Sequence, residues 1–275
     1  MIVARRRARL PGFGLSLGVT LAALSFSVLV PLSALLLAVF RLDGATIRRV
    51  ASDPRVLAAV RLSLETAVAG AVAAALVGVL LAWVLVRYRF PLRRVIDALV
   101  DLPFALPTAI AGIALTTLWA PNGWFGRPLA AAGVKVAFTP LGICLALLFL
   151  GLPFTVRTLQ PVLEGLDPEV EEAAASLGAS RLDVFRRVVL PEIVPPGVTG
   201  FTLALARGLG EYGSVVYISG NLPMRTEVAP LLIMAKLEQY DVAAATALAA
   251  LLLALSFVLL FGANRLEAWS ARAGR

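Results

Sequence analysis

Residues 172–191 read EAAASLGASRLDVFRRVVLP, a polar segment that separates two long apolar stretches of the chain. The segment follows a spaced pattern: Glu-Ala-Ala, three residues, Gly, nine residues, an aliphatic residue, one residue, then Leu-Pro. The fixed positions are held by Glu172, Ala173, Ala174, Gly178, Leu190 and Pro191, and Val188 stands where the pattern usually has Ile. Because the spacing is fixed over about twenty residues, a chance match is improbable.

The first half of this segment predicts a short amphipathic helix. Asp167 followed by Pro168 is typical of a helix start, because the aspartate accepts from the first turn and the proline lacks a donor there. Apolar residues then recur at helical spacing on one face. They are Val170, Ala173, Ala174 and Leu177.

The second half predicts another short helix after a bend. Gly178 is expected to take a left-handed conformation that ends the first helix. Ser180 and Asp183 have the spacing of a capping box, and Pro191 is expected to end the second helix. Two such helices form a knob that suits a groove on another protein, whereas the plainer alternative is an interfacial loop whose small residues simply pack.

The composition is that of an integral membrane protein. Of the 275 residues, 60% are hydrophobic and 15% charged, and the mean hydropathy is +0.89. A soluble domain carries about 25% charged residues. Stretches without charge that are long enough to cross ~30 Å of hydrocarbon as helices cover 10–40, 66–86, 102–126, 136–156 and 242–264. A sixth, at 195–218, is interrupted by Arg207 and Glu211, so the expected fold is all-α with six transmembrane helices.

The distribution of Arg and Lys predicts the orientation of these spans. With the N-terminus in the cytosol and six crossings, the inside segments hold fifteen basic residues and the outside segments nine. Both termini are therefore expected in the cytosol, and so is the loop at 157–194. This inference is independent of the Glu-Ala-Ala pattern.

Several classes of function are excluded by residues that the chain lacks. It has no histidine, which excludes histidine-ligated metal sites, Ser-His-Asp hydrolysis and histidine proton relays. Its one cysteine, Cys144, forms no intrachain disulfide, and neither lysine lies in a phosphate-binding loop. We therefore expect no catalytic residue, no metal and no cofactor in this chain, and any ATP must be bound by a partner. The basic charges flank apolar runs, so they indicate contact with membrane lipid and not with nucleic acid.

The chain resembles a family of importer permeases over residues 59–262. The spaced pattern at 172–191 is similar to the loop by which permease subunits of ATP-binding-cassette importers dock onto their ATPase. Three further stretches resemble the T-type permease subunits of sulfate/thiosulfate importers, which are relatives of the molybdate permeases. They begin LPFALPTAIAG at Leu102, FTPLGICLALL at Phe138 and ARGLGEYGSVV at Ala206.

The resemblance implies a type I importer permease fold with cytosolic coupling helices. It divides the chain into 1–58, with the basic N-terminus, first transmembrane helix and outer loop; 59–262, the permease domain with its coupling loop at about 160–191; and 263–275, a cytosolic tail. It also implies a bacterial inner-membrane location. The implied partners are two ATPase subunits, a second permease of the W type and a periplasmic sulfate/thiosulfate-binding protein.

A second group of residues is a candidate translocation pathway or gate. It comprises Arg207, Glu211, Tyr212, Ser214 and Asn221. An ionisable residue at membrane depth usually faces the bundle interior or water, so Arg207 is a candidate for helping an oxyanion across. The alternative is a structural pair between Arg207 and Glu211, which lie four residues apart.

Three other functions compete with the leading hypothesis. A molybdate permease subunit has the same loop. A secondary anion transporter driven by an ion gradient normally places acidic residues at mid-membrane, where only Glu211 qualifies. An integral-membrane enzyme is disfavoured because the chain has no histidine and no clustered intramembrane carboxylates.

Overall fold

The computed structural model describes residues 13–273, and every regular element in that range is helical. Five segments within it are long and apolar enough to cross a membrane: Phe13–Phe40, Pro54–Arg87, Pro140–Glu164, Arg181–Leu209 and Val242–Trp269. The first comprises α1 (Phe13–Leu24), a π-helical turn (Ser25–Leu29) and α2 (Val30–Phe40). The others contain α4 (Pro54–Arg87), α9 (Pro140–Glu164), α12 (Leu190–Leu209) and α15 (Val242–Ala273). The all-α membrane fold expected from the sequence is confirmed.

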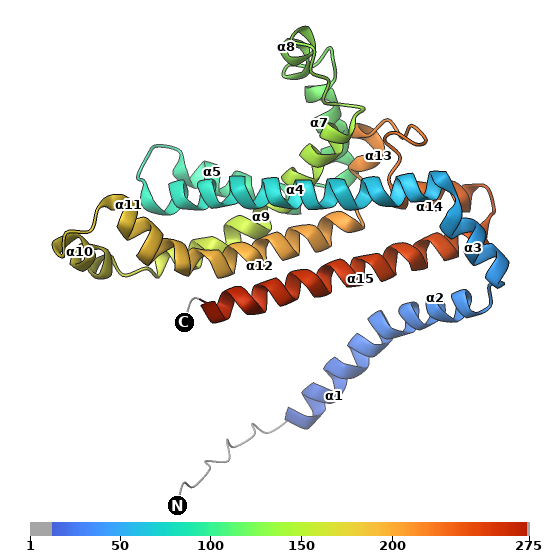
Figure 1. Cartoon of the computed structure of the whole chain (residues 1–275), viewed down its shortest axis with the longest axis horizontal. Coiled ribbons are helices and arrows are strands. Elements are labelled where there is room, and N and C mark those ends of the chain that lie inside the picture. The colour runs from blue at the N-terminus through green and yellow to red at the C-terminus, as the bar shows by residue number, and fades with distance from the viewer. Residues whose placement is uncertain (1–12, 274–275) are drawn as a thin grey trace, which may run out of the picture.

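The centre of the molecule is a bundle in which α4, α9, α12 and α15 run side by side (Figure 1). Small residues let the helices approach closely, as expected for membrane helices. A Cβ added at Gly70 of α4 would lie 2.6 Å from Cβ of Leu147 in α9. A Cβ added at Gly78 would lie 2.6 Å from Cβ of Thr155. These close approaches leave no room for a side chain at either glycine, so the helices are tightly packed there.

The third expected span, 102–126, is not one helix. α5 (Arg93–Val100) precedes this range, and the chain within it forms α6 (Leu102–Ala105), α7 (Thr108–Trp119) and, after a turn, the start of α8 (Gly126–Ala131). Leu106 precedes Pro107 and is extended, with ψ 134°, because proline disfavours a helical residue before it. At 1.5 Å per residue, α7 rises only about 18 Å, less than the hydrocarbon core of ~30 Å. Among residues 13–273, the six expected crossings thus correspond to five long helices and the shorter α7.

Most of the shorter helices lie at the two ends of the bundle (Figure 1). At one end are α3 (Gly44–Ser52) and α14 (Ala229–Glu238). At the other end are α10 (Pro168–Ser176) and α11 (Arg181–Val184), and α15 ends on this side. α7 and α8 rise away from the bundle beside α13 (Val215–Ile218). The Glu-Ala-Ala segment and the last long helix therefore share an end of the molecule.

Candidate functional site

The first helix of the 160–191 loop begins as the sequence predicts. Asp167 precedes α10, and its Oδ1 accepts from the backbone N–H of Glu169 at 2.9 Å. Pro168 occupies the first turn, and Glu169 and Glu171 place negative charge at the positive end of the helix dipole. Gly178 ends the segment with φ +88°, the left-handed conformation that glycine adopts without strain.

The second helix begins with the capping box that was expected. The backbone N–H of Asp183 donates to Oγ of Ser180 at 3.2 Å, and Oδ2 of Asp183 accepts from the backbone N–H of Ser180 at 3.3 Å. Oγ of Ser180 also donates to the same carboxylate, and these hydrogen bonds lower the pKa of Asp183. The turn between the two helices is therefore held by its own side chains and needs no partner to form.

The prediction that Pro191 ends the second helix is wrong. After α11 the chain makes a π-helical turn (Phe185–Val189), in which the N–H of Leu190 donates to the carbonyl of Phe185. The helix then continues through Leu190 and Pro191, which lie in the first turn of α12, and runs to Leu209. Proline has no N–H to donate and is tolerated in a first turn, so the extra residue of the π-turn accommodates it without a break.

The apolar face of α10 points outward. None of its residues is buried, and Val170 is 53% exposed. Leu177, in the turn that follows, is 90% exposed. Glu172 and Ala173 are also exposed, and Ala174 is half-buried. Within residues 13–269, the chain itself therefore leaves most of this apolar face uncovered.

The six residues of the spaced pattern fall in two places. Glu172, Ala173 and Ala174 lie on α10 and Gly178 in the turn after it, whereas Leu190 and Pro191 begin α12. The pattern thus joins an outward-facing knob to the start of a transmembrane helix. Leu190 and Pro191 are both exposed.

An arginine that the sequence analysis used only for its charge organises the bundle near this loop. Arg157 of α9 donates from Nε to Oδ1 of Asp101 at 2.8 Å and from Nη1 to Oδ1 of Asp97 at 2.7 Å. Nη2 donates to Oδ2 of Asp101 at 2.6 Å. A hydrogen bond from Gln160, together with Arg157, lowers the pKa of Asp97. This cluster fastens α5 and α6 to α9.

The candidate pathway residues are only partly brought together. Nη1 of Arg207 lies 2.5 Å from Oε2 of Glu211, whose side chain is 3% exposed. The other carboxylate oxygen, Oε1, accepts from the backbone N–H of Ser214 at 2.8 Å and from its Oγ at 2.9 Å. α12 ends at Leu209, so Glu211 lies just beyond the helix. The sequence had indicated a position within the span. Both carboxylate oxygens of Glu211 therefore bind groups of this chain at the end of α12.

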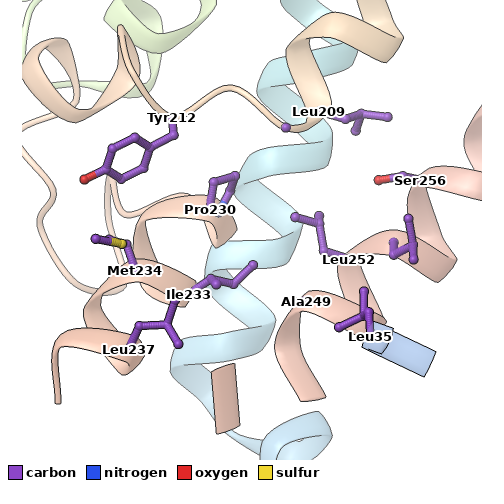
Figure 2. A pocket seen from close by; sticks show the side chains of 12 residues that line it. Leu35, Leu209, Tyr212, Pro230, Ile233, Met234, Leu237, Ala249, Leu252 and Ser256 are labelled. Carbon is purple, nitrogen blue, oxygen red and sulfur yellow. The ribbon is translucent and has the colours of Figure 1, made fainter. Parts of the chain in front are cut away.

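The other two candidates lie apart from this pair. Asn221 has φ +47° and is exposed, and its backbone N–H donates to Oγ of Ser219 at 3.1 Å, which makes it a turn residue. The ring of Tyr212 lines a separate apolar cavity of about 460 Å³ between α2, α14 and α15 (Figure 2). Leu35, Met234 and Leu252 also line this cavity, and none of its lining residues is charged. An anion has no counter-charge there, so the cavity is unsuited to a sulfate site.

An ion pair with a buried carboxylate lies at the opposite end of the molecule, and no pattern in the sequence indicated it. Nε and Nη2 of Arg55 donate to Oε2 and Oε1 of Glu227 at 2.8 and 2.7 Å. The side chain of Glu227 is 1% exposed. The pair joins the start of α4 to the segment before α14.

The chain has extensive relatives among known proteins. A family model described as "Binding-protein-dependent transport system inner membrane component" matches residues 74–272. The "Sulfate transport system permease protein CysT" of Salmonella typhimurium is 47% identical over 267 residues, which cover 97% of this chain and 96% of the relative. The protein of the same name from Synechocystis sp. is 44% identical over 254 residues, 92% of this chain and 89% of the relative.

Two solved structures have a similar fold. One is a chain of a bacterial ABC transporter involved in the import of alginate, with a TM-score of 0.66 and 17% identity, covering 92% of this chain and 94% of that one. The other is a chain of the MetNI methionine ABC transporter in an inward-facing conformation, with a TM-score of 0.58 and 16% identity, covering 78% and 95%. The fold is that of the type I importer permeases.

Proposed function

The chain belongs to the family of binding-protein-dependent transport system inner membrane components, and on this premise we propose that it carries sulfate or thiosulfate across the membrane. It is a permease subunit of an ABC importer and not an enzyme, since ATP hydrolysis resides in a separate subunit. The name of the relatives that align along nearly its whole length supports sulfate as cargo.

We propose that the 160–191 loop is the surface that docks onto the ATPase. The observation that carries this proposal is the exposed apolar face of α10, on a knob whose two helices cap themselves. In this assignment Glu172, Ala173 and Ala174 contact the ATPase, and Gly178 provides the bend between the helices. Leu190 and Pro191 begin the transmembrane helix that receives the motion.

The importer needs an ATPase and a binding protein besides this chain, as permeases of this family do. We propose two copies of the ATPase, a second permease of the W type and a periplasmic receptor for sulfate or thiosulfate. No cofactor is proposed for the chain itself, because ATP binds to the partner.

The protein is a multi-pass membrane permease. We propose that both termini face the cytosol. The excess of Arg and Lys in the segments expected inside supports this orientation. Its agreement with the position of α10, α11 and the end of α15 at one end of the bundle supports it further (Figure 1).

For the candidate gate, we propose that Arg207, Glu211 and Ser214 brace the end of α12. A compensated arginine attracts anions weakly, and Glu211 uses both carboxylate oxygens within the chain. Tyr212 and Asn221 are assigned no contact with the anion. Selection of sulfate then rests with the receptor, and the permease offers a weak pathway from which the anion is readily released.

The proposal is tested by the uptake of radiolabelled sulfate. Uptake is measured in a strain that lacks this chain and in the same strain after the chain is restored. We expect uptake that needs ATP and is competed by thiosulfate more strongly than by molybdate. Preferential competition by molybdate would favour the molybdate permease. Uptake that survives loss of the ATPase but collapses with an uncoupler would contradict an ATP-driven importer.

A further inference from the structure

An arginine at the end of α4 joins this transmembrane helix to the loop. Arg87 lies in the last turn of α4, and its Nη2 donates to Oε1 of Glu171 in α10, 84 residues further along the chain. The guanidinium carbon lies 5.2 Å from the ring centre of Trp83, one turn earlier in α4. Trp83 meets Phe185 edge to face, with ring centres 5.7 Å apart. We call these four side chains the Arg87 cluster.

The Arg87 cluster connects elements that packing alone leaves loosely joined. α10 buries none of its residues, and a cavity of about 400 Å³ lies between it, the end of α4 and the π-helical turn. Trp83, Glu171 and Phe185 line this cavity. Among the side chains that the structure describes, those of residues 13–269, the hydrogen bond from Arg87 to Glu171 is the one that joins α10 to the bundle.

The environment makes this pair firmer than an ordinary surface ion pair. The side chains of Arg87 and Glu171 are 24% and 25% exposed, so water screens them incompletely. Nε of Arg87 is buried and has no hydrogen-bond partner in the described part of the chain, so the guanidinium depends on Glu171 and the Trp83 ring.

The neighbouring glutamates of α10 are used differently. Glu171 points back to Arg87, whereas Glu172 is exposed and its carboxylate has no hydrogen bond or ion pair with the side chains described for residues 13–269. Glu172 is therefore free for a partner protein. The two residues place an internal contact and an external contact side by side on one short helix.

We propose that Arg87, acting through Glu171, is the positioning residue that transmits movement of the loop to the transmembrane bundle. The inference rests on the proposed docking of the loop onto the ATPase. A displacement of α10 pulls on the end of α4 through the ion pair, and on the start of α12 through Phe185 and Trp83. Because α4, α9 and α12 are packed at Gly70, Gly78 and Gly200, the displaced end moves the bundle as a unit.

The test uses the complete importer, with ATPase, partner permease and receptor, reconstituted in proteoliposomes. The variants are Arg87→Gln, Glu171→Gln and the double substitution. Glu238→Gln is the control, since Glu238 lies outside the loop at the end of α14, is exposed and makes no side-chain bond among the described residues. Three quantities are measured: co-purification with the ATPase, ATP hydrolysis, and sulfate uptake.

We expect each single variant to retain the ATPase and its hydrolysis but to lose sulfate transported per ATP by about five- to tenfold. The double variant is expected to lose no more than the worse single variant, because both remove the same link. The control keeps wild-type uptake. Losses that multiply in the double variant, unchanged uptake in the single variants, or variants that no longer assemble with the ATPase would each overturn the transmitting role.

Failure of the docking proposal has a different signature. If Gly178→Asp assembles and transports normally, the loop does not dock onto the ATPase, whatever the Arg87 variants show. If Gly178→Asp blocks uptake but the Arg87 and Glu171 variants are unaffected, the docking proposal stands and the Arg87 cluster is only a packing contact.

Discussion

Arg55 and Glu227 lie 172 positions apart and form a two-point ion pair, in which the arginine is partly exposed and the carboxylate is buried. The side chain of Arg55 is 35% exposed and that of Glu227 1%. This difference in exposure determines how much stability is lost when either side chain is removed. If the arginine is removed, a buried carboxylate is left without its charged partner, whereas removal of the carboxylate leaves an arginine that is partly exposed to solvent.

Arg55→Ala is therefore expected to destabilise the protein more than Glu227→Gln. We expect a loss of about 3 kcal/mol for Arg55→Ala, because it leaves an unpaired buried charge, and of about 1 kcal/mol for Glu227→Gln, which keeps the shape and part of the hydrogen bonding. The measurement is the melting temperature of the purified importer in detergent. If the two variants lose equal stability, or if Glu227→Gln loses more, water must reach the ion pair in the membrane protein.

Gly178→Asp is expected to abolish uptake without preventing membrane insertion. Gly178 has φ +88° and open space around its Cα, so an aspartate there strains the backbone modestly and adds a charged side chain to the proposed docking surface. Gly133 is the matched control, since it has φ +82°, equally open surroundings and a place in the turn between α8 and α9. Gly133→Asp is expected to leave uptake within about twofold of wild type. Loss of uptake in both variants would point to backbone strain and not to docking.

The sequence predicted the local structure of the loop because the signals are short-range. The cap of Asp167 acts over two residues, and the capping box of Ser180 and Asp183 over three. Gly178 needs only its own backbone to show its left-handed conformation. Each of these features depends on neighbours that can be read along the chain.

The links between distant elements could not be predicted in this way. Arg87 and Glu171 are 84 positions apart, and Arg157 lies 60 and 56 positions from Asp97 and Asp101. Helical periodicity and charge counts do not pair residues at such distances. These arginines were therefore counted only toward the membrane orientation, although the structure uses them to join helices.

Two prolines, Pro107 and Pro191, affect their helices in opposite ways. Counting uncharged residues merged 102–126 into one span, although Pro107 divides it. Conversely, Pro191 was expected to stop a helix that continues, since the π-helical turn before it supplies an extra residue. Whether a proline breaks a helix depends on its position relative to the first turn, and the sequence alone did not reveal where α12 begins.

Arg207→Ala is expected to reduce assembly of the importer more than its apparent affinity for sulfate. The substitution leaves the buried carboxylate of Glu211 with Ser214 as its remaining partner, at a cost of about 3 kcal/mol.

Arg61→Ala is the matched control, because Arg61 and Glu65 have the same spacing but are 79% and 56% exposed. That control is expected to leave the yield of assembled complex unchanged, because water screens an exposed ion pair. The measurements are the yield of assembled complex and the half-saturating concentration of sulfate. A fully assembled Arg207→Ala importer with a raised half-saturating concentration would instead assign Arg207 to the anion pathway.

The Arg157 cluster predicts a contribution to stability that is lost in acid. The hydrogen bond from Gln160 and the charge of Arg157 lower the pKa of Asp97 below its ordinary value of 3.8. A carboxyl group whose pKa is lower when folded than when unfolded stabilises the protein fully above the unfolded pKa, and this contribution disappears as the pH falls through the folded pKa. The melting temperature of the wild-type importer is therefore expected to fall as the pH drops below about 4. The melting temperature of Asp97→Asn is expected to start lower and to decline less steeply.

Asp167→Asn serves as the control, because it retains a side-chain oxygen that caps α10 and lies outside the cluster. If Asp97→Asn and wild type declined in parallel, the acid sensitivity would arise elsewhere and α5 would be held to α9 without the ionised form of Asp97.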